Sequence, residues 1–187
     1  MRKVVVSEFV TVDGVMEDPG GSEKTAHGGW SFRFWSDEAA KFKYDELFAS
    51  DALLLGRKTY QGFAEAWPSR TGDPFSDRMN SLPKFVVSTT LDRVDWKNSS
   101  LIRGNVAEHV RKLKQQPGQD ILVAGSAQLV QSLLRDDLID ELRLMVHPIV
   151  LGGGKRLFGG APDAKTLKLL DSKTFSSGIV LLAYAKG

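Results

Sequence analysis

Apolar and polar residues along this chain fall into blocks whose spacing changes, and residues 120–134 show the pattern most completely. Four consecutive apolar residues at 121–124 predict a short strand that is covered on both faces of a parallel sheet. Gly125 then supplies a tight turn, and Ser126 can cap a helix whose apolar residues repeat at the spacing of one helical face. Such a junction directs unpaired backbone N–H groups at one point and suits a phosphate, although the same two residues can serve only to turn and cap the chain.

The same order of strand, glycine and helix occurs earlier in the chain. Residues 52–55 predict a second short buried strand, and Gly56 turns it. Arg57 and Lys58 then lead into a helix that ends at Pro68. This second junction therefore carries two cations as well as a glycine and a helix start.

A helix is predicted over residues 36–48, with Ser36 as its cap. Its inner stripe is expected to comprise Ala40, Tyr44, Leu47 and Phe48. The loop before it, residues 17–35, is long enough to be functional or mobile. That loop contains four aromatic residues, Trp30, Phe32, Phe34 and Trp35.

Apolar runs and alternation predict further strands at 3–12, 85–87, 142–146, 167–170 and 179–184. Another helix is expected to begin at Asn105 and to stop before Pro117. From residue 142 onward Leu142, Leu144 and Val146 face one way and Arg143, Met145 and His147 the other, so we expect this strand to have one polar face. Alternating strands and helices followed by consecutive strands predict a three-layer α/β fold, with a mostly parallel central sheet and an antiparallel C-terminal end.

Composition narrows the class of protein. The chain is expected to form a single domain, residues 1–187, because two domains would each lie near the small end of the usual size range. With no Cys there can be no disulfide and no thiolate metal site, and the three His residues form no ligand pair at metal spacing, so no metal is expected. The net charge of +2, without a long basic tract, argues against nucleic-acid binding.

The N-terminal residues bear on localisation. Two basic residues precede an apolar run, but Ser7 and Glu8 soon break it, which argues against a signal peptide. No stretch approaches an uninterrupted transmembrane length. We therefore expect a cytoplasmic protein that does not bind membranes.

Polar groups gather where three of the predicted strands end. Gly56, Ser88 and Gly125 each follow a buried strand and should open on the same edge of a parallel sheet, where open α/β folds bind ligands. Two glycine-marked helix starts, two cations and the hydroxyl groups of residues 88–90 together favour a site for a polyanion. The sequence lacks the G-x-S-x-G elbow of a nucleophilic hydrolase.

Five segments, in this order along the chain, resemble the dihydrofolate reductase fold, and specifically the family of the C-terminal reductase domain of the bifunctional riboflavin-biosynthesis deaminase-reductase. They are Thr11-Val-Asp-Gly14, Leu55-Gly-Arg-Lys-Thr-Tyr60, Lys84-Phe-Val-Val-Ser-Thr89, Ile121-Leu-Val-Ala-Gly-Ser126, and Ile139-Asp-Glu-Leu-Arg-Leu with Pro148-Ile-Val-Leu-Gly-Gly-Gly154 and Arg156-Leu-Phe158. The resemblance spans nearly the whole chain and implies NADPH as cofactor and hydride transfer to a small molecule. Because a zinc deaminase needs cysteine ligands, this chain would be the reductase module alone.

The resemblance also implies a role for four groups of residues. The cofactor phosphates would be held at one helix start by Gly56, Arg57, Lys58 and Thr59. The adenosine 2′-phosphate would lie at Ser88 and Thr89. The pyrophosphate would be held at the other helix start by Gly125, Ser126, Ala127 and Gln128, with Ser126 standing where relatives usually have a second glycine. The nicotinamide would lie beside Val12, Gly14 and Val15.

The substrate pocket is expected between the loop 17–35 and the helix that follows it. Its aromatic wall would be formed by Trp30, Phe34 and Trp35. Glu38, about where dihydrofolate reductases keep a substrate-binding carboxylate, is the candidate catalytic residue, with Asp37 as the alternative. Beside aromatic rings its carboxyl would be partly desolvated, which favours the protonated form, although it can equally be a charge that complements the helix dipole.

Other functions stay open at this point. One is true dihydrofolate reduction, which the lengthened loop 17–35 disfavours, and another is a nucleotide-binding or assembly module without catalysis. The resemblance further implies a homodimer, for which the strands at 142–146 and 179–184 could supply an apolar contact.

Overall fold

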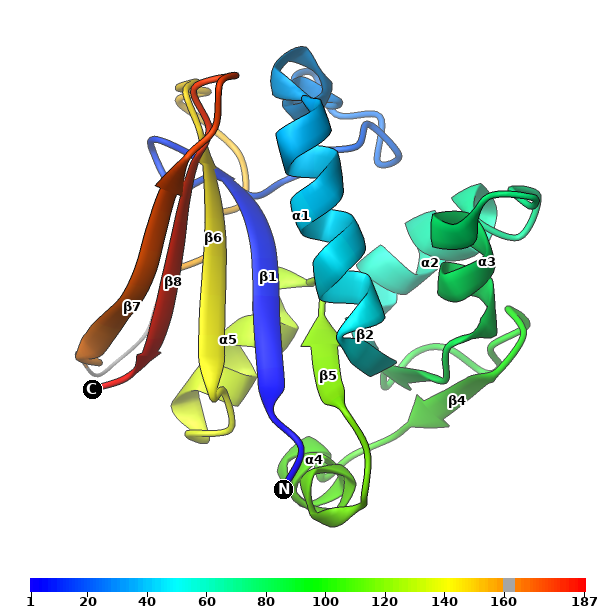
Figure 1. Cartoon of the computed structure of the whole chain (residues 1–187). Coiled ribbons are helices and arrows are strands. Elements are labelled where there is room, and N and C mark those ends of the chain that lie inside the picture. Colours follow the sequence, from blue (N-terminus) through cyan, green and yellow to red (C-terminus); the bar gives the residue numbers. More distant parts are fainter. Residues whose placement is uncertain (160–163) are drawn as a thin grey trace.

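The computed structural model of the chain describes residues 1–159 and 164–187, and Figure 1 shows how its elements are arranged. The strands are β1 (Val4–Thr11), β2 (Ser50–Gly56), β3 (Lys84–Val87), β4 (Ser99–Ile102), β5 (Asp120–Val123), β6 (Glu141–His147), β7 (Leu167–Thr174) and β8 (Val180–Lys186). The helices are α1 (Asp37–Phe48), α2 (Arg57–Ala66), α3 (Pro74–Ser81), α4 (Val106–Gln115) and α5 (Ala127–Arg135), with a 3₁₀ helix, η1, at Trp30–Phe34.

Within the described residues the strands form one eight-stranded sheet in the order β4-β3-β2-β5-β1-β6-β8-β7. The pairs from β4 to β6 are parallel, whereas β8 pairs antiparallel with both β6 and β7. One apolar core lies between the sheet and helices α4 and α5, and another involves α1, α2 and α3. Figure 1 accordingly shows α1 in front of the sheet and α5 behind it. The predicted three-layer α/β fold, mostly parallel with an antiparallel end, is confirmed.

The central strand β1 is covered on both faces. Val4 and Val6 belong to the core that includes α4 and α5, whereas Val5 packs in the core that includes Leu47 of α1 and Tyr60 of α2. Successive side chains of a strand point to opposite faces, so a run of valines fits a position between two layers of helices. No helix in the described part of the chain is long and apolar enough to cross a membrane.

Helix α1 begins as predicted but buries a different stripe. The Ser36 hydroxyl accepts a hydrogen bond from the Ala39 N–H at 3.2 Å, which confirms the cap. Of the expected stripe, Tyr44 and Phe48 are 39% and 38% exposed. The buried residues of the helix are Ala39, Glu46 and Leu47. The expected stripe was right at Leu47, which is 1% exposed, and wrong at Tyr44 and Phe48. Glu46 faces the sheet instead and pairs there with basic side chains, and an apolar pattern cannot anticipate a buried acid.

The polar face expected for β6 is also wrong. Met145 and His147, on the side that alternation assigned to solvent, are both fully buried. The aromatic rings of Phe9, Trp30 and Phe34 pack edge-on against His147, so η1 and β1 cover this end of the strand. A strand at the centre of a sheet with helices on both sides has no solvent face to display.

Two short elements, α3 and β4, were not predicted. Asp73 caps α3 by accepting from the Ser76 N–H, and Pro74 occupies the first turn, where proline needs no hydrogen-bond donor. This Asp-Pro pair is a helix-start signal that the polar composition of the segment obscured. Strand β4 is four residues long and half polar, which leaves little periodicity to detect.

The loop 17–35 is fixed by one buried carboxylate. Asp18 is 3% exposed and accepts hydrogen bonds from the N–H groups of Glu23 and Thr25 and from the Thr25 hydroxyl. The Trp30 indole N–H donates to the Glu17 carbonyl at 2.8 Å. The loop therefore has internal polar contacts of its own, in addition to the packing of η1 on the sheet.

Candidate functional site

Three strand ends meet at one edge of the sheet. Strand β2 lies between β3 and β5, with Gly56 opposite Val87 and Leu54 opposite Val123 in parallel register. The residues that follow these strands, beginning at Ser88 and Gly125, therefore lie on either side of Gly56. The sequence-based expectation that these three positions open on a common edge is confirmed.

The starts of α2 and α5 are in direct contact. The Gly56 N–H donates to the Gly125 carbonyl at 3.0 Å, and the peptide bond between Gly125 and Ser126 is cis. A Cβ on Gly56 would stand 2.8 Å from the Ser126 backbone nitrogen, which is closer than such atoms approach without displacement. Only glycine at this position lets the two helix starts lie side by side.

These two helix starts differ from the others in how they are capped. In the described residues, α1, α3 and α4 each begin with a side chain that accepts a backbone hydrogen bond, from Ser36, Asp73 and Asn105 respectively. Neither α2 nor α5 has a side-chain cap, and Ser126 occupies the cap position without making that bond. The first-turn N–H groups of both helices are thus left for an anion, which the positive ends of the helix dipoles also favour.

The two cations at the start of α2 are not equivalent. The Lys58 ammonium pairs with the Glu23 carboxylate at 2.9 Å, and Glu23 also lies 3.9 Å from the Lys155 ammonium. Arg57 is exposed, and its guanidinium makes only a long 3.4 Å contact with the Gln61 side chain. Arg57 is therefore the cation more readily available to a bound phosphate.

The hydroxyl groups after β3 also divide into two kinds. Ser88 is 6% exposed, and its Oγ accepts hydrogen bonds from the N–H groups of Thr90 and Leu91. This hydroxyl shapes the turn that follows the strand. Thr89 is exposed and is the hydroxyl of the pair that a ligand could reach.

The segment after β1, which carries Val12, Gly14 and Val15, is held by Asp13. The Asp13 carboxylate accepts from the Thr11 hydroxyl at 2.6 Å and from the N–H groups of Leu151 and Gly152. These bonds, the one from Thr11 above all, lower the pKa of Asp13 to about 2. Val15 is fully buried and Val12 is 63% exposed. The turn is thereby tied to the glycine-rich loop 151–154.

The start of α2 and the segment after β1 converge on Gly125, at the start of α5. A Cβ placed on Gly125 would lie 2.7 Å from Thr59 Oγ1, 3.7 Å from Met16 Cε and 3.8 Å from Glu8 Oε1. Its φ of +88° is also a conformation that suits glycine. The start of α2, the segment after β1 and the start of α5 thus meet at one point, together with an acid from within β1.

That acid, Glu8, was missed as a candidate. Its side chain is buried, with 5% of the residue exposed, and its Oε1 has no hydrogen-bond partner among the described residues. Burial raises the pKa of Glu8 from 4.5 to about 8. The charge of Lys43 and the nearby Gly125 N–H, which lies outside hydrogen-bond geometry, oppose this rise, and the charge of Glu46 adds to it. The sequence signal was a single Glu inside an apolar strand, which had served only to argue against a signal peptide.

A charged cluster connects α1 to the sheet beside Glu8. The Lys43 ammonium donates to the Ser7 hydroxyl at 2.9 Å and pairs with Glu46. The Glu46 carboxylate, 1% exposed, also accepts from the Arg143 guanidinium at 3.1 Å, and Arg143 pairs with Glu141 at 2.7 Å. The surroundings of Glu8 therefore include a lysine whose charge is largely balanced by another acid.

The predicted aromatic wall is mostly packed against the sheet. Trp30 is 2% exposed, and its ring lies 5.0 Å from that of His147. Phe34 is partly buried, and its ring centroid lies 6.0 Å from that of His147. Trp35 is 46% exposed, and its ring centroid lies 6.1 Å from that of Phe9. Trp30 thus belongs to the core beneath the loop, and a substrate role for Phe34 and Trp35 stays a prediction.

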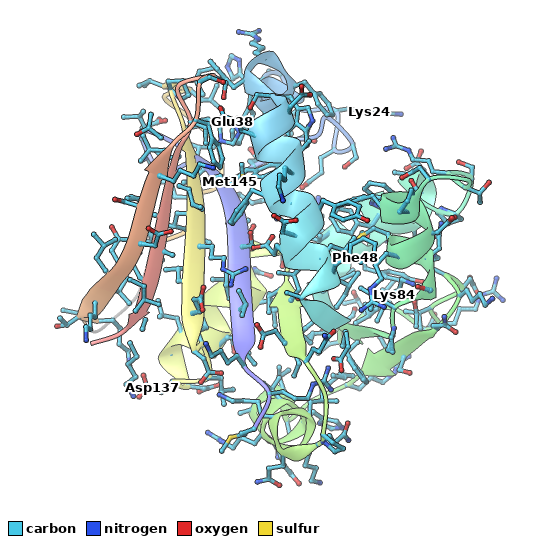
Figure 2. The ribbon with its side chains drawn as sticks, in the orientation of Figure 1. Lys24, Glu38, Phe48, Lys84, Asp137 and Met145 are labelled. Carbon is cyan, nitrogen blue, oxygen red and sulfur yellow. The ribbon has the colours of Figure 1, made fainter. Side chains whose placement is uncertain are left out.

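The environment expected for Glu38 is wrong. Its carboxylate accepts hydrogen bonds at 2.6 Å from both the N–H and the hydroxyl of Ser176, in the turn between β7 and β8. These bonds lower the pKa of Glu38, so its carboxyl is ionised at neutral pH instead of being kept protonated by desolvation. Figure 2 shows Glu38 at the start of α1, close to that turn. Its role in orienting a substrate, like that of Asp37, remains a prediction.

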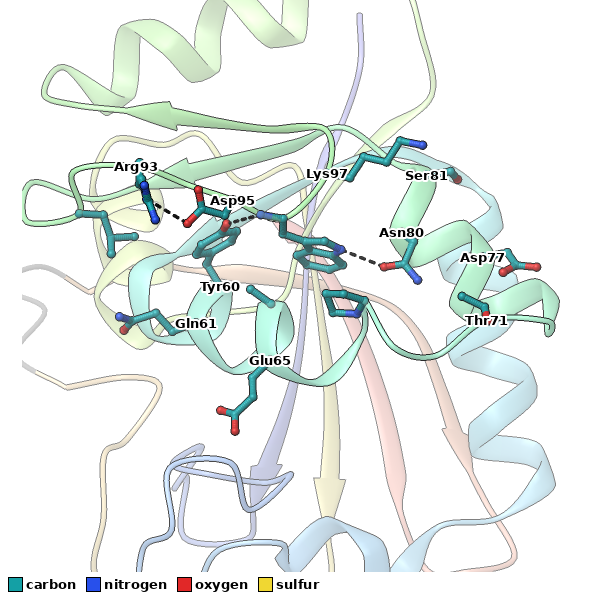
Figure 3. Close-up of a pocket in the computed structure, with 14 residues that line it drawn as sticks. Tyr60, Gln61, Glu65, Thr71, Asp77, Asn80, Ser81, Arg93, Asp95 and Lys97 are labelled. Atoms are coloured by element: carbon teal, nitrogen blue, oxygen red, sulfur yellow. Dashed lines mark hydrogen bonds and ion pairs between the residues drawn. The ribbon is translucent and has the colours of Figure 1, made fainter.

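A cavity of about 740 Å³ opens elsewhere, between α2, α3 and residues 91–97 (Figure 3). Its wall includes Trp96, whose indole N–H donates to the Asn80 side chain, and the Arg93–Asp95 ion pair. None of the residues predicted to hold a phosphate lines this cavity. The polar groups named here are already paired with one another.

The sheet and its paired helix starts define an open α/β protein in which two uncapped helix starts meet at one edge of the sheet. The chain belongs to the RibD C-terminal domain family, whose model matches residues 2–181. It is 34% identical to the uncharacterized protein YyaP of Bacillus subtilis (strain 168), over 98% of this chain and 94% of that protein. The fold is therefore the dihydrofolate reductase-like fold expected from the five sequence segments, and membership of this family supports a reductase-like role.

Solved structures agree with this fold. A Shewanella sp. PV-4 protein provisionally named for riboflavin biosynthesis superposes with a TM-score of 0.77 at 23% identity, covering 100% of this chain and 99% of that one. The Thermotoga maritima diaminohydroxyphosphoribosylaminopyrimidine deaminase/5-amino-6-(5-phosphoribosylamino)uracil reductase gives a TM-score of 0.68 at 15% identity. The match covers 100% of this chain and 57% of that bifunctional protein.

Proposed function

We propose that this protein is an NADPH-dependent reductase that transfers a hydride to a small heterocyclic or carbonyl compound. The observation that carries the proposal is the pair of uncapped helix starts, in contact at Gly56 and Gly125, on an edge where the segment after β1 also arrives. Family membership supports the reductase class. A phosphate-bearing cofactor fits the site, because an anion can occupy the N–H groups that no side chain caps.

In this proposal, different groups of residues hold different parts of the cofactor. The first-turn N–H groups of α2 and α5 donate backbone hydrogen bonds to the phosphates, while Gly56 and Gly125 let the two helix starts lie close together. Arg57 and Thr89, both exposed, contact the adenosine 2′-phosphate, while Ser88 and Lys58 hold the turns on which these contacts depend. Val12 and Gly14 lie beside the nicotinamide, which supplies the hydride when bound, and the buried Val15 holds their turn through its N–H bond to the Thr11 hydroxyl.

Calorimetric titration with NADPH and NADH tests the assignment. We expect NADPH to bind more tightly, and Arg57→Gln to weaken NADPH binding more than NADH binding, because a charge-assisted contact to the 2′-phosphate is lost. Arg111→Gln, at an exposed arginine on α4, is the matched control and should change neither affinity. Equal affinities of the native protein for the two cofactors would contradict the assignment of a 2′-phosphate site.

A second measurement separates a reductase from a module that only binds nucleotides. NADPH absorbance is followed with a panel of pterins, pyrimidines and simple carbonyl compounds. Acceptor-dependent oxidation supports the proposed reductase, and tight NADPH binding without oxidation by any acceptor would favour a non-catalytic nucleotide-binding role. Oxidation confined to dihydrofolate would favour true dihydrofolate reduction.

A further inference from the structure

Glu8 is a buried acid to which the proposed cofactor contacts assign no role. It lies in the middle of β1, opposite Leu144 of β6, where helices cover both faces of the sheet. A buried carboxyl without a hydrogen bond is costly to a fold, and such groups need either a hidden partner or a function. Oε1 has no partner among the described residues.

The position of Oε1 points to the functional edge. It lies 3.8 Å from the place that a Cβ on Gly125 would occupy, and Met16 Cε and Thr59 Oγ1 border the same place. These neighbours come from the segment after β1 and from the start of α2. The buried Oε1 therefore lies beside the junction that would hold the cofactor.

The groups around Glu8 decide its protonation state. From α1, Lys43 and Glu46 act on it with opposite signs, and they form an ion pair with each other. From the junction before α5, the Gly125 N–H favours the charged form, while Thr59 of α2 and Met16 contribute no charge. Burial outweighs these effects and raises the pKa of Glu8 to about 8, so at pH 7 the carboxyl is mainly protonated.

We propose that Glu8 is the catalytic acid of this reductase, donating the proton on its side chain to the acceptor atom that gains electrons during hydride transfer. The inference rests on the proposed function. Glu38 cannot take this part at neutral pH, because its carboxylate is ionised and accepts two hydrogen bonds from Ser176.

The proposed step balances as follows. The carbon of a C=N or C=O bond would gain a C–H bond by accepting the hydride that the bound cofactor supplies, and the cofactor would be oxidised in exchange. The π electron pair moves onto the nitrogen or oxygen, which takes the proton from Glu8. Glu8 is left as a carboxylate, which the ammonium of Lys43 stabilises until a proton from solvent restores the acid.

Infrared difference spectroscopy tests the inference without an acceptor. The native protein at pH 7 should show the carbonyl band of a protonated carboxylic acid, which Glu8→Gln removes and which disappears as the pH is raised above 8. Glu65→Gln, at an exposed carboxylate on α2, is the control and should leave the band in place. The band should shift when NADPH binds, because the cofactor changes what the carboxyl faces. Absence of a Glu8-dependent band, or a band that saturating NADPH leaves unmoved, overturns the inference.

Turnover with the best acceptor of the panel provides the second arm. Glu8→Gln should keep the native affinity for NADPH while kcat falls by about 100-fold or more, as expected for loss of a general acid. The native fall in kcat at basic pH should be missing from the residual activity of that variant. If the native protein binds no NADPH, the proposed function itself fails. If NADPH binds and Glu8→Gln turns over like the native protein, only the role of Glu8 is overturned.

Discussion

Replacing Glu8 with glutamine should make the protein more stable, and the gain should depend on pH. The folded protein holds the Glu8 carboxyl protonated up to about pH 8, whereas its pKa in the unfolded chain is near 4.5. Between these values the folded state binds more protons than the unfolded state, so stability falls as the pH rises. Below pH 4.5 both states are protonated and the penalty vanishes.

The size of the effect follows from the two pKa values. Holding a carboxyl neutral at pH 7, 2.5 units above an unfolded pKa of 4.5, costs about 3 kcal/mol at 1.36 kcal/mol per unit. Glutamine keeps the shape and polarity of the protonated acid without this cost. We therefore expect Glu8→Gln to be more stable than the native protein by up to about 3 kcal/mol at pH 7, and by less than about 1 kcal/mol at pH 5.

Urea unfolding at pH 5, 6, 7 and 8, for the native protein, Glu8→Gln and Glu65→Gln, measures this difference. Effects of other titrating groups cancel when the two curves at each pH are subtracted. The gain in Glu8→Gln should grow steadily from pH 5 to pH 8, and Glu65→Gln should show none. A gain that is the same at all four pH values would refute the reasoning, because it would mean that Glu8 has the same pKa in both states.

Three further outcomes are expected. Burial lowers the pKa of His147, so the folded protein binds fewer protons than the unfolded chain below about pH 6.5 and loses stability on acidification. In urea unfolding, the free energy of unfolding of His147→Phe should therefore fall less between pH 6.5 and pH 5 than that of the native protein. Gly56→Ala should weaken NADPH binding at least about tenfold in calorimetry by forcing the helix starts apart, with Gly20→Ala, which has open space, unaffected. Light scattering should show a homodimer, and a mass near 20.6 kDa at micromolar concentration would contradict this.

The homodimer prediction needs a different surface from the one first expected. Leu142 and Leu144 of β6 and Leu181 of β8 are buried within this sheet, so these strands offer little apolar area to a partner. Strand β7 lies at the edge of the sheet and exposes Leu169 and Leu170, each at 52%. If two copies pair, this edge is where we expect the contact.

The glycine junctions could be predicted because they depend on local chemistry. A run of apolar residues, a glycine and an amphipathic helix can be recognised in the sequence. Because parallel strands end on one edge of a sheet, Gly56 and Gly125 were correctly predicted to lie together. Short polar elements such as α3 could not be found in this way, because their stability depends on caps and on the core they cover.

The acids show where sequence reasoning stops. Glu8, Glu38 and Glu46 are the same residue type, yet their environments differ. Oε1 of Glu8 is buried with no partner among the described residues, Glu38 is bound to a distant turn, and Glu46 is in an ion-pair cluster. Each environment depends on residues far away in the chain. A pattern of apolar and polar positions contains none of these contacts. For this reason the sequence analysis missed Glu8 and selected the more exposed Glu38 as the candidate catalytic residue.

The Lys58 ammonium pairs with Glu23, so the loop 17–35 and a phosphate at the start of α2 would compete for the same positive charge. A phosphate arriving at the start of α2 would draw the Lys58 ammonium away from Glu23, and so weaken one attachment of residues 18–29. Thermodynamic linkage requires the reverse as well: neutralising Glu23 should strengthen anion binding by the same factor that the anion loosens the loop. Since a partly exposed ion pair contributes at most about 1 kcal/mol, this factor is at most about fivefold. Anion binding at this edge and ordering of the loop would then be coupled, so that a measurement of one reports on the other.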